Sequence, residues 1–82
     1  MIVVSFKTRK SQKEILDKAV EYFVDDVGLK ITERSDCCVH FGDENQLGFV
    51  KITLSQKGKE FEVDVESREY EYQAKRFVSN FK

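Results

Sequence analysis

Two side chains that could do chemistry, Cys38 and His40, stand two residues apart, with Asp36 just before them. Residues two apart in a strand point to the same side, so the thiol and the imidazole would share a face. Thiolate, imidazole and carboxylate groups all bind zinc, but a zinc site needs three or four converging ligands. The chain has one histidine and two cysteines, and we expect Cys37 to face the core. The sequence therefore predicts no metal site and no cofactor.

The same residues do not predict an enzyme. A cysteine–histidine nucleophilic pair needs a third group that orients the histidine, and a pocket for the substrate. The sequence identifies neither, and it offers no general base with a partner. A disulfide between the neighbours Cys37 and Cys38 would need strained geometry that a regular strand opposes. We therefore expect ordinary strand residues at these positions and a protein that is not an enzyme.

A cluster of basic and hydroxyl side chains precedes the first expected helix. Free backbone N–H groups and the positive end of the helix dipole attract phosphate or carboxylate at such a place. No glycine brings the backbone close to a phosphate, however, and a Ser11–Glu14 capping box would occupy some of the N–H groups. Anion binding is therefore the second function that we consider. Its candidate residues are Lys7, Arg9, Lys10, Ser11 and Lys13.

The strongest structural pattern is a pair of alternating apolar and polar runs between Phe49 and Glu66. Such alternation is typical of strands with one buried face, and Gly58 suits a tight turn between them. An odd loop would set Val50 against Asp64, so we expect a loop of two or four residues. A turn at Lys57-Gly58 would pair Leu54 with Phe61, Ile52 with Val63 and Val50 with Val65.

The remaining patterns complete a single α+β domain over residues 1–82, in the order β-α-β-β-β-β-α. Apolar residues at helical spacing predict one helix over 11–27, ended by Gly28, and a second that Ser67 caps. Strands are expected at 2–6, 29–34 and 37–41 besides the hairpin. One dry sheet face predicts a two-layer sandwich, a mostly antiparallel five-stranded sheet with both helices on that face. The first strand could pair with the second or the fifth, and we favour the fifth because it covers a long edge.

The other sheet face should be open, yet it carries apolar groups beside the carboxylates of the last strand. An apolar patch rimmed by charge is typical of an interaction site. Single exposed apolar residues are ordinary, however, and a bulge at Gly48 would turn its neighbours inward. We therefore expect a small protein-interaction or accessory domain that self-associates, as a homodimer, through this face or an edge strand. The candidate residues are Cys38, His40, Leu47, Phe49 and Lys51.

Composition argues against other classes. The net charge of −1 over 82 residues, together with an acidic strand, argues against nucleic acid as a partner. No apolar run approaches the roughly 18 residues that a membrane span needs. The first residues lack the pattern of a signal peptide, so the cytoplasm is the expected location. The partner that we expect is another protein or a second copy of the chain.

Overall fold

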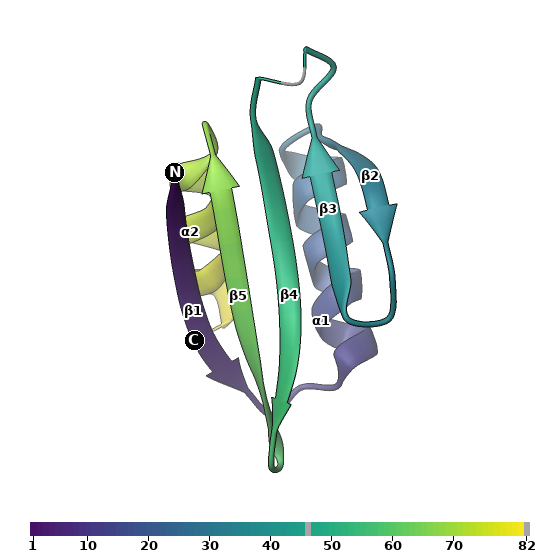
Figure 1. Ribbon diagram of the computed structural model, residues 1–82, viewed down its shortest axis with the longest axis vertical. Coiled ribbons are helices and arrows are strands. Elements are labelled where there is room, and N and C mark those ends of the chain that lie inside the picture. Colours follow the sequence, from purple (N-terminus) through teal and green to yellow (C-terminus); the bar gives the residue numbers. More distant parts are fainter. Residues whose placement is uncertain (46, 82) are drawn as a thin grey trace.

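A computed structural model describes residues 1–45 and 47–81 as one five-stranded sheet covered by helices on one side (Figure 1). All neighbouring strands are antiparallel, in the order β1-β5-β4-β3-β2. The predicted α+β sandwich is confirmed, and so is the pairing of the first strand with the fifth. The elements are β1 (Ile2–Thr8), α1 (Gln12–Val20), η1 (Glu21–Asp26), β2 (Lys30–Arg34), β3 (Cys38–Gly42), β4 (Phe49–Lys57), β5 (Glu60–Arg68) and α2 (Glu71–Phe81).

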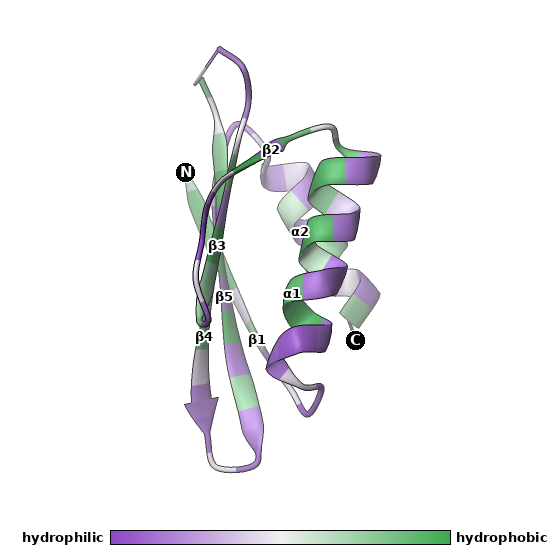
Figure 2. Ribbon diagram, turned by 90° about the vertical axis from the view of Figure 1, so that its right-hand side faces the viewer, coloured by the Kyte–Doolittle hydropathy of each residue, from purple (hydrophilic) through white to green (hydrophobic). Residues whose placement is uncertain are grey.

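The two layers are clearest from the side, where the helices lie on one face of the sheet and leave the other face without a helix (Figure 2). The buried residues come from alternate positions of the strands and from one stripe of each helix, as the apolar spacing predicts. The aromatic rings of Phe23, Phe41 and Phe77 join the two layers, with centroids 5.2 and 5.3 Å from that of Phe23. The buried core comprises Phe6, Ile15, Leu16, Ala19, Phe23, Leu29, Val39, Phe41, Val50, Ile52, Leu54, Val63, Val65, Ala74, Phe77 and Val78.

The central hairpin has the predicted parity and a different register. Its loop has two residues, but they are Gly58 and Lys59, because Lys57 pairs with Glu60. Gly58 has a φ of +64° and occupies the first central position, the arrangement of a type II′ turn. Leu54 therefore faces Val63 rather than Phe61. The predicted pairing was wrong by two residues, which keeps every side chain on its expected face.

The first helix begins as predicted and continues in another form. The Ser11 hydroxyl accepts the Glu14 N–H at 3.2 Å, which confirms the N-cap. After α1 the chain widens into the π-helical segment η1, whose end is marked by a bond from the Val27 N–H to the Tyr22 carbonyl at 3.0 Å. Gly28 then takes the predicted left-handed conformation, with a φ of +91°. The sequence contains no signal for the π-helical turns.

Two predictions at the ends of elements were wrong. Ser67 does not cap the second helix; it is a fully buried residue of β5, paired with Ile2 and Val50. The helix begins at Glu71 instead. Cys37 does not face the core either, because the turn after β2 continues through it and leaves it exposed.

The buried hydroxyl of Ser67 gives a testable prediction. Among the described residues this Oγ has no hydrogen-bond partner, and an unsatisfied buried polar group costs about 1–3 kcal/mol. We expect Ser67→Ala to raise the free energy of unfolding by about 1 kcal/mol in urea titration. Ser55→Ala, on the half-exposed outer side of β4, is the control and should change it by less than about 0.5 kcal/mol. A loss of stability in Ser67→Ala would contradict the prediction and would mean that the hydroxyl contributes favourably to the folded state.

Candidate functional site

The sheet face without helices, called the open face below, holds four of the five predicted binding residues. In the register Cys38 lies opposite Thr53, His40 opposite Lys51, and Gly42 opposite Phe49. The alternate residues Val39, Phe41, Val50 and Ile52 are fully buried on the helix side, so their neighbours point outward. Leu47 lies in the loop before β4 instead, with 67% of its surface exposed.

The carboxylates of β5 have neighbours on both adjacent strands, and those on β1 were not predicted from the sequence. The β1–β5 register sets Ser5 opposite Asp64 and Lys7 opposite Glu62. The Ser5 hydroxyl donates to Asp64 Oδ1 at 2.6 Å. On the other side, Lys51 of β4 stands opposite Glu66. The acidic ladder is therefore flanked by cations and a hydroxyl, which makes the open face a mixed polar surface rather than a negative one.

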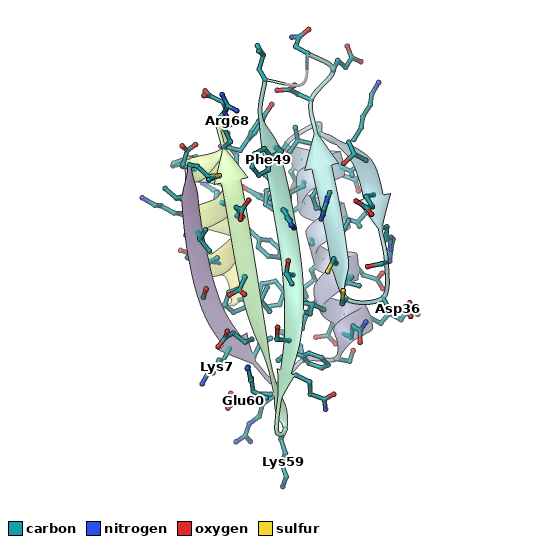
Figure 3. The ribbon with its side chains drawn as sticks, in the orientation of Figure 1. Lys7, Asp36, Phe49, Lys59, Glu60 and Arg68 are labelled. Atoms are coloured by element: carbon teal, nitrogen blue, oxygen red, sulfur yellow. The ribbon has the colours of Figure 1, made fainter. Side chains whose placement is uncertain are left out.

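Apolar side chains on the open face are separated by charge. Phe49, half-buried, stands at the upper end of β4 opposite Arg68 (Figure 3). Val3 of β1 is 59% exposed and lies opposite Glu66. Strand β5 thus inserts charged residues between Val3 and Phe49, two strands apart. Binding through the open face stays a prediction, with less apolar surface to support it than the alternation alone indicates.

The histidine has an acidic neighbour that sequence reasoning missed. Glu33 of β2 places its Oε2 atom 3.4 Å from His40 Nδ1. The register of β2 shifts between Ile31 and Glu33, a bulge that no residue pattern announced, and this shift sets Glu33 opposite His40. Among the described residues, no hydrogen bond joins Cys38 to His40, and no three acidic, cysteine or histidine side chains converge to hold a metal ion.

The predicted anion-binding residues are spread over two surfaces. Lys7 belongs to β1 and points to the open face, opposite Glu62. Around the helix start, Lys10 Nζ lies 3.1 Å from the Glu14 carboxylate. Lys13 lines a separate open pocket that Asp36 also borders. Anion binding stays a prediction, although Lys10, the lysine just before the helix, already has Glu14 as an acidic neighbour.

The two edge strands, β1 and β2, lie at opposite sides of the sheet (Figure 1). They differ sharply in length, regularity and charge. Strand β2 is short and bulged, and three of its five residues, Lys30, Glu33 and Arg34, are charged. Short length, bulges and charge are the devices by which proteins prevent edge-to-edge pairing. Strand β1 has none of them over Ile2–Phe6: its register with β5 is unbroken, and its first charged side chain is that of Lys7.

The side chains of β1 that point to the helix side are incompletely covered by the rest of the protein. Phe6 is buried, but Ile2 and Val4, which point to the same helix side, are only half-buried. Val4 packs against the core at its margin. An edge strand with unpaired backbone groups and half-covered apolar side chains is a template for a further strand. The sequence predicted self-association through an edge strand or the open face. The contrast between the two edges could be recognised only in the folded structure.

Comparison with known proteins gives no further guide, because no protein-family model matches the chain and no curated protein matches it. Within the described residues, none of the helices has the length and apolar character to cross a membrane.

Proposed function

We propose that this chain is a small non-enzymatic interaction domain that forms a homodimer by pairing the β1 strands of two copies. The observation that carries the proposal is the contrast between a protected edge at β2 and an unprotected, apolar edge at β1. We place the protein in the cytoplasm, a reducing compartment in which its two free cysteines remain thiols.

The sequence of β1 allows two copies to pair antiparallel with apolar residues opposite apolar residues. A two-fold axis at Val4 would set Val4 against the second copy's Val4, and Ile2 against the second copy's Phe6. On the open face, Val3 would meet the second copy's Ser5. Moving the axis to Ser5 would set Val3 against Lys7. An axis between two residues would set side chains of the helix side against side chains of the open face. The Val4-centred register therefore keeps apolar residues together.

Such a dimer would join the two sheets into one and cover the half-buried side chains of Ile2 and Val4. Backbone hydrogen bonds supply affinity in strand addition, and side chains supply register. A single strand pair buries less than the roughly 1,200 Å² of a standard stable interface, so we expect a weak dimer with a dissociation constant of about micromolar order.

The first functional prediction concerns charges on the two edges. Val4→Lys adds an inward-pointing charge at the centre of β1, which should oppose strand pairing and give a monomer. Val3→Lys does the same from the open face, where 59% exposure leaves packing undisturbed. The matched control is Ile31→Lys on β2, 42% exposed, which should remain a dimer. Light scattering and sedimentation between about 10 µM and 1 mM would measure the molecular mass.

Two results would overturn the proposal. A wild-type chain that remains monomeric over the whole concentration range would remove the dimer. A dimer that survives both β1 substitutions, but dissociates with Ile31→Lys or with Phe49→Lys, would move the interface to β2 or to the open face. Circular dichroism of each variant would establish that a monomer is folded, so that lost association is distinguished from lost structure.

A further inference from the structure

An open groove lies in the helix layer, between the first helical segment and the last helix. Helices α1 and α2 cover the same side of the sheet (Figure 1), and the groove is lined by the end of α1, by η1 and by α2. Three of its lining residues are aromatic: Tyr22 stacks on Phe77 at 6.1 Å, and the ring of Phe81 lies 5.0 Å from that of Phe77. Its volume of about 210 Å³ is below the roughly 300–1,000 Å³ of sites for drug-sized ligands, so it suits a small molecule.

The π-helical winding of η1 brings two carboxylates to this groove. Glu21 and Asp26 are the first and last residues of η1, five positions apart, and both line the groove. Hydrogen bonds of a π-helix join residues five apart, which sets such residues one above the other, whereas an α-helix of 3.6 residues per turn would direct them to different sides. Asp26 also stands at the negative end of the helical run, where a carboxylate is unfavourable and a bound cation would offset it. Because π-helical turns frequently lie at functional sites, the groove gives a reason for this segment.

The groove has charges of both signs, and among the residues that the structure describes none of its three charged side chains is in an ion pair. Lys18 and Glu21 are three positions apart, a spacing at which opposite charges can meet. Instead the Lys18 ammonium lies over the ring of Phe81, 5.6 Å from its centroid. Nearby on α2, the Arg76 guanidinium donates to the Tyr72 hydroxyl at 3.2 Å. One ammonium and two carboxylates are therefore available beside the aromatic rings.

We propose that this groove binds a free α-amino acid with an aromatic or large apolar side chain. The Glu21 and Asp26 carboxylates receive the ligand ammonium, and the Lys18 ammonium receives the ligand carboxylate. The ligand side chain packs on the rings of Tyr22 and Phe81, since aromatic pairs are favourable at centroid distances of about 4.5–7 Å. A ligand with only one sign of charge would leave a charge of the groove unmatched. The groove belongs to the helix layer, so this proposal does not depend on the pairing of β1.

The test is titration of the full chain with L-phenylalanine, followed by the backbone amide signals in NMR spectra. A ligand of this size should bind with a dissociation constant of about millimolar order, and the shifts should gather at residues 18–26 and 77–81. Phenethylamine lacks the carboxylate, and hydrocinnamate lacks the ammonium. Each should bind about two- to fivefold more weakly than phenylalanine, which is the range expected for one exposed ion pair.

Substitutions of the charged residues should separate the two ends of the ligand. Glu21→Gln should weaken the binding of phenylalanine and phenethylamine about two- to fivefold, and that of hydrocinnamate should not weaken. Lys18→Gln should weaken the binding of phenylalanine and hydrocinnamate, and that of phenethylamine should not weaken. Asp26→Asn and Asp25→Asn form a matched pair, because both remove one carboxylate from η1 but only Asp26 lines the groove. Only Asp26→Asn should weaken the binding of phenylalanine.

Each of three outcomes would contradict this assignment. Phenylalanine at about 20 mM, well above the expected dissociation constant, might move no amide signal of the groove, which would remove the site. Equal binding of phenylalanine and phenethylamine would show a site for a cation alone. Equal losses in Asp25→Asn and Asp26→Asn would mean that net charge, rather than contact in the groove, decides binding. Circular dichroism of each variant would establish that it is folded.

Discussion

Replacing Phe23 with alanine is expected to reduce the free energy of unfolding by about 3–5 kcal/mol, the usual cost of removing a buried aromatic ring. Phe23 is fully buried, and its ring lies 5.0 Å from the ring of Tyr22, 5.2 Å from that of Phe41 and 5.3 Å from that of Phe77. It therefore connects η1 with both β3 and α2. A methyl group at this place would leave a cavity that three separate elements would have to close.

Urea titration followed by circular dichroism would measure this change. Small domains have free energies of unfolding near the lower end of about 5–15 kcal/mol, so the variant should be partly unfolded at 37 °C. Tyr72→Ala is the control, since it removes an aromatic ring that is 69% exposed and should cost less than about 0.5 kcal/mol. A cost below about 1.5 kcal/mol for Phe23→Ala would mean that the neighbouring rings collapse into the space.

The face of each residue in the hairpin could be predicted from the sequence, but its partner could not. Alternation fixes parity, because an error of one residue would bury Asp64. A shift by two residues exchanges one apolar partner for another, and Leu54 is equally well matched with Phe61 or Val63. Only the position of Gly58 in the turn separates the two registers. With a φ of +64° it takes the first central position, which moves the turn to Gly58-Lys59.

Predictions failed where a distant segment decides the local structure. Ser67 follows acidic residues and precedes a helical stripe, which is typical of a helix cap. Instead it remains in β5 because that strand is paired on both sides, with β1 and β4. The chain turns only afterwards, at Glu69, whose φ of +70° is unusual for a residue other than glycine. No sequence window around Ser67 contains either neighbouring strand.

The candidate site depended on the same distant pairings. The residues of the open face followed from alternation, and four of the five lie there. Ser5, the neighbour of Asp64, and Glu33, the neighbour of His40, could be identified only once β1 and the bulged β2 were placed. From the sequence, the β1 edge could be named only as one of several possible interfaces, because its lack of protection against strand pairing is seen only by comparison. It stands out against β2, which is short, charged and irregular.

Gly48 is the position at which one methyl group should do the most damage. A Cβ there would lie 2.7 Å from Tyr70 Cε2, 2.8 Å from the Arg68 carbonyl oxygen and 2.8 Å from Glu69 Cβ. Distances below 3.0 Å require movement, and one of the obstructing atoms belongs to the backbone. Gly48 precedes β4, so its neighbours on the β5–α2 connection cannot retreat without disturbing the pairing of Phe49 with Arg68.

Hydrogen bonds to the Asp43 carboxylate also hold Gly48 close to Tyr70, and a displaced loop would lose them. Asp43 accepts the Leu47 N–H at 3.0 Å, the Gly48 N–H at 3.2 Å and the Tyr70 hydroxyl at 3.1 Å. Burial, and then the bond to Asp43, raise the pKa of Tyr70, because both favour the neutral phenol that donates. Asp43 therefore ties the β3–β4 loop to the segment that leads into α2.

We expect Gly48→Ala to cost about 2–4 kcal/mol, since overpacking typically costs about 1–3 kcal/mol and the Asp43 bonds would lengthen as the loop moves. Urea titration would measure the cost, and the amide signals of Leu47 and Tyr70 would report the displacement. Gly28→Ala is the matched control, because its φ of +91° brings strain without any atom within 4 Å. That strain should cost about 1–2 kcal/mol. If Gly48→Ala costs no more than Gly28→Ala, the β5–α2 connection must yield to the methyl group, and the loop is not fixed by this contact.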